Sequence, residues 1–488
     1  MNFRKVATDT LVSGVRITLN TFSNIIVIPI ITKFMGTDKY GIWVTIFALA
    51  SVFIAIGKMH LKGALIRYSS NERTAGQTFY ETLLLSIASA TAFSLFFLFL
   101  HSTIGILPVD DSTISKEILI FGAGVHIFLT ILFSIPVNYP RAQGRVKHTE
   151  IILLIKQFLI TLVLIPVLYY NQDLVTALWS MVAILFLLNV GVLIFVLPQP
   201  VVRPDFDQIK QHLRYSLPMV PKALSSRILT HADKYLILYF LSPTATGVYA
   251  VVYGVTTMLR TLSSPLNSTL YPTVTAAWDN RESENLQRLY SLILKGYSFI
   301  GIPAIVGLTL LAEPLLRYLS TADVAREGQL LVPILAIGFL LRGYENSFTY
   351  VLKAAEETWR IGLIIVVAMV LNLCLNVILI PTAGLKGAAL ATLTSHILIA
   401  SYIIYHSLNH FELSIPFLDI GRSIFASGVM AFVLVTIPVP SGIKTKLVLY
   451  PVAGVLIYAV TIVLVGGVNR AEINMIRLFI SDLIDIRE

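Results

Sequence analysis

The segment IILLIKQFLITLVLIPVLYY, residues 151–170, decides the fold class. A second apolar segment, 174–197, follows after only three residues. About twenty consecutive apolar residues are needed for a helix to cross the hydrocarbon core of a bilayer. Neither segment shows the alternating polarity of a transmembrane barrel strand, which is about ten residues long. The two segments therefore predict an all-α integral membrane protein.

The same pattern continues through the chain of 488 residues, of which 56% are hydrophobic and 13% charged. Soluble proteins average about 45–50% apolar and about 25% charged residues. About fourteen spans leave fewer than about 200 residues for loops and ends, so we expect no soluble catalytic domain. The predicted spans are 10–33, 40–57, 80–101, 117–138, 149–170, 174–197, 215–241, 246–269, 288–311, 328–352, 358–381, 385–408, 418–437 and 446–467.

The loop charges predict the orientation. With a cytoplasmic N-terminus, about twenty Lys and Arg residues near span ends lie inside and about eight outside, as the positive-inside rule requires. An even number of spans also places the C-terminus in the cytoplasm. The net charge of +9 therefore reflects topology, and nucleic acid is not an expected partner. The predicted cytoplasmic cations include Lys58, Lys62, Arg67, Arg73, Arg141, Arg145, Lys147, Arg203, Lys210 and Arg214.

A short motif occurs twice. GTDKYGIW at 36–43 resembles SPTATGVY at 242–249, so that Gly41 aligns with Gly247 at an offset of 247 − 41 = 206. Six predicted spans separate the copies, which makes equivalent helices run in the same direction. We expect two six-helix lobes in a parallel pseudo-repeat, 1–198 and 215–410. A cytoplasmic linker, 199–214, joins them, and 411–488 adds two transmembrane helices and a cytoplasmic tail. Transporters with repeated halves bind substrate at the interface between them.

Ionisable residues inside the predicted spans form a lopsided set, because cations outnumber anions. Such residues cost a few kcal/mol each and usually face a cavity or a partner. Arg16, Asn20 and Asn24 are spaced by four residues, and the 206 offset carries Arg16 onto Lys222. A water-filled cationic cavity or an anionic ligand is therefore expected. The intramembrane cations are Arg16, Lys156, Lys222, Arg227, Lys234, Arg260, Lys295 and Arg342, and the anions are Asp233 and Glu345.

Simpler interpretations apply to some of these residues. Lys156 and Lys295 lie near cytoplasmic ends, which favours extension of their side chains to the headgroups. Asp233 with Lys234, and Arg342 with Glu345, are equally compatible with structural ion pairs. Arg16, Lys222, Arg227 and Arg260 have no obvious local partner, and we expect them in the cavity.

The arginines indicate a phosphorylated substrate, since a guanidinium group binds two phosphate oxygens through parallel hydrogen bonds. No nucleotide-binding loop, HExxH motif or Cys/His cluster is present, which predicts no catalytic residue, metal or cofactor. A Na+ or H+ gradient, or the gradient of the substrate, would drive transport, with Asp233 or Glu345 as the coupling carboxylate. The predicted substrate-binding residues are Arg16, Asn20, Asn24, Lys222, Arg227, Lys234, Arg260 and Arg342.

Several motifs carry a family resemblance. NLCLN at 372–376 precedes LIPTAGLKGAALAT at 379–392, and ADKYLIL at 232–238 precedes TGVY at 246–249. Together they resemble the O-antigen and exopolysaccharide flippase branch of the multidrug/oligosaccharidyl-lipid/polysaccharide exporter superfamily. The resemblance covers nearly the whole chain in the number and order of spans.

The resemblance implies a V-shaped pair of lobes in the cytoplasmic (inner) membrane that moves an undecaprenyl-pyrophosphate-linked oligosaccharide by alternating access. Lumenal arginines of such flippases bind pyrophosphate, and Arg16, Lys222 and Arg227 match by position. The two C-terminal helices resemble those that form a lipid-tail groove in the lipid II flippase. Membrane lipids and other polysaccharide assembly proteins are the implied partners.

Two alternatives remain open. A drug or organic-cation antiporter of the same superfamily would have an acidic lumen, which the excess of cations disfavours. A membrane polysaccharide polymerase or ligase would need a catalytic base and usually a large external loop. The longest external gaps, 102–116 and 312–327, are short for such a loop.

Overall fold

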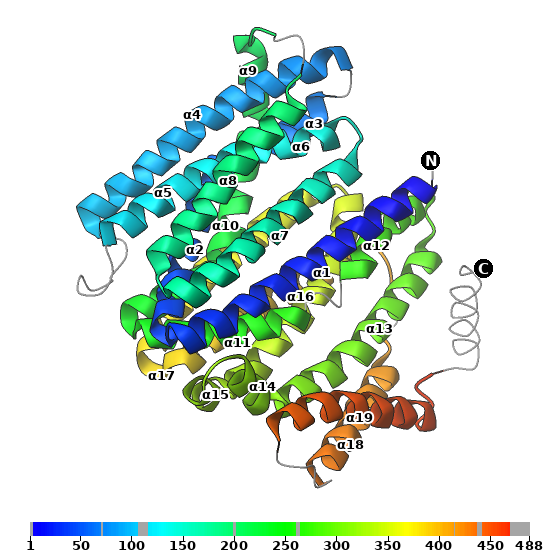
Figure 1. Cartoon of the computed structure of the whole chain (residues 1–488). Helices are drawn as coiled ribbons and strands as arrows, with labels where there is room; N and C mark the ends of the chain where they lie inside the picture. The colour runs from blue at the N-terminus through cyan, green and yellow to red at the C-terminus, as the bar shows by residue number, and fades with distance from the viewer. Residues whose placement is uncertain are drawn as a thin grey trace, which may run out of the picture.

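The computed structural model describes residues 3–69, 72–105, 116–198, 202–259, 264–413, 415–436 and 442–468, and within them the regular structure is helical (Figure 1). This confirms the predicted all-α class. The helices are α1 (Phe3–Phe34), α2 (Thr37–Gly57), α3 (Leu61–Tyr68), α4 (Glu72–Ile104), α5 (Lys116–Leu132), α6 (Ser134–Ala142), α7 (Val146–Asn171), α8 (Leu174–Val196), α9 (Phe206–Ser216), α10 (Val220–Phe240), α11 (Pro243–Thr256), α12 (Ser264–Asp279), α13 (Ser283–Leu310), α14 (Ala312–Leu319), α15 (Ala322–Gly328), α16 (Leu331–Ala354), α17 (Thr358–Leu408), α18 (Phe417–Thr436) and α19 (Ile443–Leu464).

Helix occupies each of the fourteen predicted spans. The long α17 holds two of them, separated at Gly384, whose φ of 59° and ψ of −139° break the helical path. Among the described residues, nine helices are long and apolar enough to cross a membrane, or ten if the bent pair α15 and α16 is one span. Helix α10 falls outside this set because four charged residues interrupt its apolar sequence.

Some predicted boundaries are wrong. The expected span 246–269 ends too early, because α12 begins at Ser264 and continues to Asp279; residues 260–263, between α11 and α12, lie outside the described residues. The predicted span 117–138 is confirmed, because α5 and α6 follow each other with helical backbone at Phe133 and form one apolar span, Lys116–Ala142. Predicted loops also contain the short helices α3, α14 and α15. In α14 the buried Leu316 packs into the main core while Arg317 is exposed, so an amphipathic pattern of one or two turns produces these helices.

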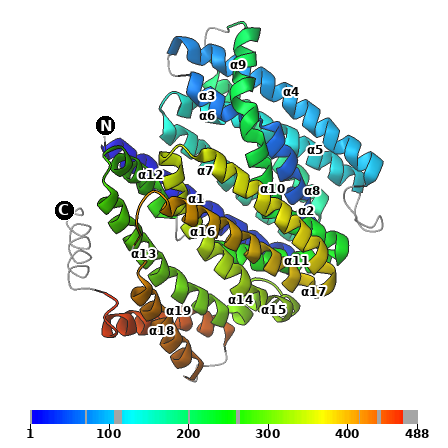
Figure 2. The same cartoon turned by 180° about the vertical axis from the view of Figure 1, so that it is seen from behind.

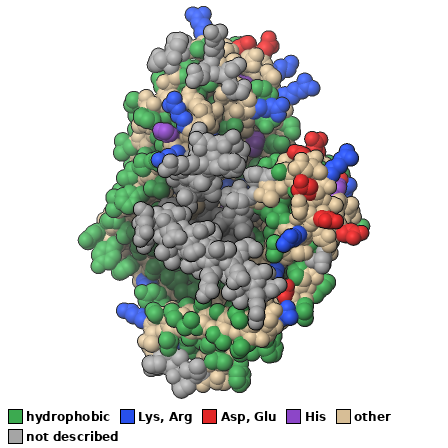
Figure 3. Space-filling view, turned by 90° about the vertical axis from the view of Figure 1, so that its right-hand side faces the viewer, with side chains coloured by type: hydrophobic (Ala, Val, Ile, Leu, Met, Phe, Trp, Pro, Cys, Tyr) green, Lys and Arg blue, Asp and Glu red, His purple; other side chains and the backbone are tan. Residues whose placement is uncertain are grey.

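The outer surface has the apolar character that a bilayer requires. Large side chains such as Phe99 on α4, Phe158 on α7 and Phe195 on α8 point outward, and Phe195 is 76% exposed. Figure 3 shows hydrophobic side chains over much of the left flank and lower part of one face, with charged side chains gathered at the top and right. Exposed apolar area on this scale marks a surface that contacts lipid or protein. The chain is a multi-pass membrane protein.

The helices form two packed sets that meet along α2. In the first set, α5 packs against α4 and α8, and α7 packs against α1 and α8. In the second set, α17 packs against α10 and α16, and α16 also contacts α12 and α13. Helix α2 packs against α10 and α11 of the second set (Figures 1 and 2). The lobe boundaries at 198 and 215 stay a prediction.

The two copies of the repeated motif touch each other at this contact. A Cβ atom on Gly41 would lie 1.9 Å from the carbonyl oxygen of Pro243, and one on Gly247 would lie 2.1 Å from that of Thr37. Both distances are far below van der Waals contact. The sequence therefore needs glycine at both positions, because the N-terminal turns of α2 and α11 cross with their backbones in contact.

The predicted linker contains helix α9, which packs against α3 and α4. The buried Glu81 carboxylate accepts hydrogen bonds from His212 Nε2 (2.8 Å), Gln77 Nε2 (2.9 Å) and the backbone N–H of Asp205 (3.1 Å). Arg67 lies over the Tyr215 ring at 4.8 Å. The segment after 205 is thus a helix fixed to the first set rather than a free loop.

The two C-terminal helices are attached to the second set through α13. Lys295 Nζ on α13 lies 3.6 Å from Asp419 Oδ2 on α18, and Arg422 Nη1 bonds the other oxygen of that carboxylate at 3.0 Å. Ser423 Oγ donates to the Ser298 carbonyl at 3.0 Å. Lys295 therefore pairs with a carboxylate of α18, and its extension to the headgroups stays a prediction. Figure 1 places α18 and α19 at the end of the molecule opposite α4.

A cationic cavity between the two helix sets

A cavity of about 510 Å³ lies where the two helix sets meet. Its volume falls in the range of about 300–1,000 Å³ that is usual for sites that bind small molecules. The first set contributes the α2–α3 turn, the α5–α6 junction and α7, and the second set contributes α10 and α16. The lining residues with polar side chains are Lys58, His60, Lys62, Thr130, Ser134, Asn138, Lys156, Ser226, Arg227, Thr230 and Arg342.

The charges of this lining have one sign. Five of the residues are Lys or Arg, and within the described part of the chain no Asp or Glu belongs to the lining. Five cations around one small volume repel each other, and the repulsion is stronger than in bulk water because protein replaces part of the solvent. An anion with several oxygens would relieve this repulsion. The cavity therefore has the electrostatics of an anion-binding site.

A sharp turn brings the first lysines to the cavity. Helix α2 ends at Gly57, where a Cβ atom would collide with Ile131 of α5, and the next residues turn before α3 begins. Met59 and His60 adopt positive φ angles of 44° and 54°. This turn directs Lys58 and Lys62 into the same cavity, although they precede and follow the change of direction.

Hydroxyl and amide groups alternate with the cations. Thr130, Ser134 and Asn138 follow one another at intervals of four residues, which places them on one helical face. Ser226 and Thr230 have the same spacing on α10. These groups can donate to and accept from sugar hydroxyls as well as phosphate oxygens.

Of the cations predicted for the cavity, Arg227 and Arg342 line it. Lys222 is half-buried and lies one turn before Ser226, on the same face of α10. Asn20 is half-buried on α1 but does not belong to the lining. Arg260 and the side chain of Asn24 lie outside the described residues.

Arg16 has a partner that the sequence did not reveal. Its Nε donates to Glu150 Oε2, and Arg141 Nη2 donates to the other oxygen of the same carboxylate. Glu150 is 2% exposed, so a buried carboxylate joins α1, α6 and α7. The sequence showed no local partner for Arg16, and this one is distant, because residues 134 positions apart become neighbours only when α1 packs on α7.

Sequence reasoning missed three lysines of the cavity. Lys58 and Lys62 were assigned to a cytoplasmic loop, and Lys156 was expected to extend to the headgroups. Lys156 instead lines the cavity, where its Nζ lies 5.1 Å from the centre of the Phe133 ring. The spacing of Thr130, Ser134 and Asn138 was the available signal, since a polar stripe within an apolar span indicates a hydrated face.

Asp233 and Lys234 form an ion pair, which is one of the two interpretations that the sequence leaves open for these residues. Lys234 Nζ lies 3.3 Å from Asp233 Oδ1, and the two residues are 4% and 1% exposed. Lys234 therefore lies in the packed interior and is absent from the cavity lining. Glu345 lies half-buried on α16, and its carbonyl accepts a hydrogen bond from Thr349 Oγ1 at 2.7 Å.

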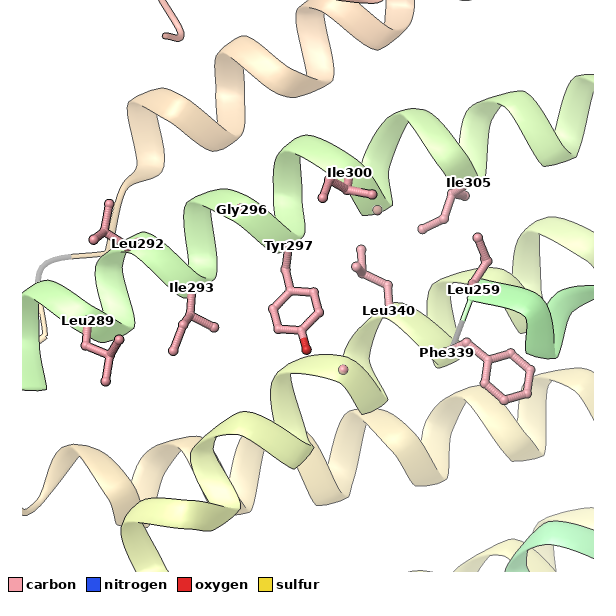
Figure 4. A pocket seen from close by; sticks show the side chains of 12 residues that line it. Leu259, Leu289, Leu292, Ile293, Gly296, Tyr297, Ile300, Ile305, Phe339 and Leu340 are labelled. Carbon is pink, nitrogen blue, oxygen red and sulfur yellow. The ribbon is translucent and has the colours of Figure 1, made fainter. Parts of the chain in front are cut away.

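An apolar cavity of about 360 Å³ lies between α13 and α16. Figure 4 shows the side chains of Ile293 and Tyr297 on α13 directed towards α16, with Leu340 on the facing side. Gly296, Gly301 and Gly343 also line it. Gly343 follows Arg342 in the chain, so α16 contributes to the lining of both cavities.

The fold and the cavity together define a class: a multi-pass, all-helical membrane protein with two helix sets around a cationic cavity. The family described as "Polysaccharide biosynthesis protein" matches residues 30–323, which is more than half of the sequence. The chain belongs to this family.

Two curated relatives come from Haloferax volcanii. The probable flippase AglR is 28% identical over 255 residues, which cover 50% of this chain and 52% of that protein. The probable low-salt glycan biosynthesis flippase Agl15 is 25% identical over 280 residues, covering 57% and 59%. The similarity spans only between half and three fifths of the length of these relatives.

Two solved structures share the fold. The lipid II flippase MurJ in an inward closed conformation aligns with a TM-score of 0.77 at 14% identity, covering 92% of this chain and 98% of that one. An inward-facing multidrug resistance transporter of the MATE family aligns with a TM-score of 0.68 at 15% identity, covering 80% and 94%. At this level of identity the likeness concerns the fold.

Proposed function

We propose that this chain is a flippase that carries an undecaprenyl-pyrophosphate-linked oligosaccharide, an O-antigen or exopolysaccharide repeat unit, across the cytoplasmic membrane by alternating access. The cationic cavity is the observation that carries the proposal. Its five cations come from both helix sets, and the described lining holds no carboxylate. The names of the two Haloferax volcanii relatives, both flippases and one of them of glycan biosynthesis, support a flippase that acts in glycan assembly.

The head of the substrate fits the chemistry of the cavity. Arg227 and Arg342 of the second set face Lys58, Lys62 and Lys156 of the first set across the same volume. A pyrophosphate between them would accept charge-assisted hydrogen bonds from both sides. Because each helix set supplies cations, binding of the anion would also draw the two sets together.

The tail of the substrate needs an apolar path beside the cavity. The cavity between α13 and α16 supports one, because its lining is almost entirely apolar and α16 lines both this cavity and the cationic one. The prenyl chain would therefore remain in lipid or in this slot while the pyrophosphate and the sugars occupy the hydrated cavity.

The contact between α2 and α11 closes one end of the molecule, and this supports an alternating-access cycle. Gly41 and Gly247 hold the helix sets in contact at the start of α2, whereas the cationic cavity lies at the end of α2, about 25 Å away along the helix. With both termini in the cytoplasm, the contact is external and the cavity lies towards the cytoplasm. This arrangement corresponds to an inward-facing state, and transport would require the contact to open.

A Na+ or H+ gradient would reset the lobes, with Asp233 or Glu345 as the coupling carboxylate. A ligand shifts such an equilibrium only through unequal affinity for the two states. Arg16, Asn20, Asn24, Lys222 and Arg260 stay proposed contacts of the pyrophosphate or the sugars. Other polysaccharide assembly proteins are proposed partners.

The rival antiporter of drugs or organic cations requires anionic groups where the substrate binds. In the described part of the chain, the cationic cavity would repel such substrates. No observation favours the polymerase or ligase alternative, and the flippase names of the relatives weigh against it.

The test uses the purified chain in proteoliposomes with a fluorescent undecaprenyl-pyrophosphate-linked disaccharide, whose outer-leaflet fraction is bleached by an impermeant reductant. The double variant Arg227→Glu/Arg342→Glu replaces two cations of the cavity by anions. We expect flipping to fall at least 100-fold, because the pyrophosphate then meets like charges.

Arg326→Glu is the matched control, since it makes the same chemical change at a side chain that is 76% exposed on α15. Flipping by this control should stay within twofold of the wild-type rate. Wild-type rates in the folded double variant would refute the assignment of the cavity, and a wild-type chain that moves no glycolipid would refute the proposed function.

A further inference from the structure

Asp233 and Lys234 place two opposite charges in the packed interior of the second helix set. Asp233 Oδ1 accepts hydrogen bonds from the backbone N–H of Lys234 (2.8 Å) and from its Nζ (3.3 Å). The same ammonium donates to the Thr230 carbonyl at 3.1 Å and lies 3.9 Å from the centre of the Tyr253 ring. Three groups, the Asp233 carboxylate, the Thr230 carbonyl and the Tyr253 ring, thus hold the lysine side chain in a single position.

Oxygen atoms surround this pair. Asp233 Oδ2 is buried and accepts no hydrogen bond of good geometry. The Tyr249 hydroxyl lies close to the carboxylate and pairs with Thr392 Oγ1 of α17 at 3.3 Å. Carboxylate, carbonyl and hydroxyl oxygens are the ligands that hard cations prefer. With the lysine side chain removed, the remaining groups would resemble a binding site for a small alkali cation.

We propose that Lys234 is the resident counter-cation of Asp233 and determines the cation specificity of this site. Its ammonium occupies the position that Na+ would need, so the wild-type chain binds no Na+ at Asp233. The inference rests on the part of the proposed function that names Asp233 as a coupling carboxylate, and it removes Na+ from the cations that can act there in this state.

The physical reason is competition between an attached cation and a dissolved one. A buried carboxylate requires a cation, because an isolated charge in the interior is strongly unfavourable. Lys234 follows Asp233 in the chain, so its ammonium is present at a high effective concentration whatever the salt in solution. The face of Tyr253 adds a cation–π contact that favours the ammonium in this position. Dissolved Na+ would have to displace all these contacts and shed its own water.

Sodium-22 binding to the purified full-length chain, at constant ionic strength with choline chloride and without glycolipid, tests this inference. Wild type should bind at background level. Lys234→Met removes the charge and keeps a similar volume, and it should bind Na+ saturably, at least fivefold above wild type. Asp233→Asn/Lys234→Met should return to background, because the carboxylate is gone.

Lys353→Met is the matched control. Lys353 also lies over a tyrosine, with its Nζ 4.8 Å from the centre of the Tyr350 ring, and its replacement should create no Na+ binding. If Lys234→Met is too unstable to purify, its heat resistance is measured in membranes in NaCl and in choline chloride. Stabilisation by Na+ alone would support the inference.

Three results would overturn it: saturable Na+ binding by wild type that Asp233→Asn removes, a folded Lys234→Met that binds no more Na+ than the double variant, or an unstable Lys234→Met that Na+ does not stabilise. Flipping is measured separately. A chain that shows the expected Na+ pattern but moves no glycolipid would refute the proposed function and leave this inference intact.

Discussion

Glu150 is the residue on which the packing of α1 depends most clearly. Its carboxylate is almost fully buried and accepts hydrogen bonds from Arg16 and Arg141, whose side chains are about a quarter exposed. Two cations on one carboxylate leave a surplus positive charge beside the cationic cavity. Glu150 therefore stabilises the packing of α1. Arg16 and Arg141, which it holds in place, contribute to the electrostatic field in this region.

Glu150→Gln should destabilise the protein, because two arginines lose their common anion in a partly buried place. Loss of one partner from a buried pair costs about 3–5 kcal/mol, and the exposure of the arginines puts this case near the lower limit. Thermal unfolding in detergent measures the change.

Glu313→Gln is the control, because Glu313 and Arg317 form an exposed pair at 3.7 Å. Such a pair contributes about 0–1 kcal/mol, so the melting temperature should hardly change. Equal melting temperatures for the two variants would contradict the structural role of Glu150.

At the scale of elements, α8 begins with a defined cap. Gln172 has a φ of 50°, which turns the chain after α7, and Asp173 Oδ2 then accepts hydrogen bonds from the backbone N–H and the hydroxyl of Thr176, both at 2.8 Å. Partial burial raises the pKa of Asp173, but these hydrogen bonds and nearby Lys39 lower it by more, so the net shift is downward. The ionised form is thus the one that the cap stabilises.

Asp173→Ala should cost about 1 kcal/mol of stability at pH 7, the usual loss for a helix cap. A lowered pKa in the folded state means that this contribution is present above the unfolded value of about 3.9 and is lost as the pH falls through the folded value. The difference in melting temperature between wild type and variant should therefore have its full size at pH 7 and at pH 5, and it should be smaller at pH 3.5.

Ser242 caps α11 by accepting from the Ala245 backbone N–H at 3.1 Å, and its hydroxyl does not titrate in this range. Ser242→Ala should lose a similar amount of stability at all three pH values. A gap for Asp173→Ala that is equally independent of pH would contradict the role of the ionised carboxylate.

For the whole molecule, the contact between α2 and α11 and the cationic cavity lie at opposite ends of α2. Gly41 and Gly247 allow the two backbones to touch, and the cavity opens where α2 gives way to Lys58. Movement of the two helix sets relative to each other would open the contact between α2 and α11 as it closes the cationic cavity, and the reverse.

Gly247→Ala should reduce flipping at least tenfold while folded protein still accumulates in the membrane. The added Cβ would lie 2.1 Å from the Thr37 carbonyl oxygen, so α2 and α11 must separate and the closed end is disfavoured. The proteoliposome assay described above measures the rate. Gly191→Ala is the control, because no atom lies within 4 Å of its added Cβ. A wild-type rate for Gly247→Ala would contradict the importance of this contact.

Much of the fold followed from local sequence. The fourteen predicted spans all contain helix, since a run of about twenty apolar residues has few other stable states in a bilayer. The errors occurred where local signals are weak. Residues 246–269 read as one apolar span although α12 continues to Asp279, and the helices α3, α9, α14 and α15 are too short or too polar to be found by hydropathy.

For the site, the sequence predicted a cationic cavity and identified Arg227 and Arg342, because charges inside apolar spans are visible without a structure. For Asp233 and Lys234 it left two interpretations open, an ion pair or separate roles in ion coupling and substrate binding, and the structure shows the ion pair. It could not find Glu150, the partner of Arg16, which is 134 positions away. Long-range pairing leaves no periodic signal, and no local rule could replace it.

By itself, the sequence determined that this protein lies in a membrane, consists of helices and carries costly buried cations, because length, hydropathy and charge are properties of short segments. Only the tertiary structure decided which cations share a cavity. It brought Lys58, Lys62 and Lys156 to face Arg227 and Arg342, and it gave Lys234 to Asp233 rather than to the cavity. The physical reason is that electrostatic interactions depend on distance in space, which helix packing sets and segment composition does not.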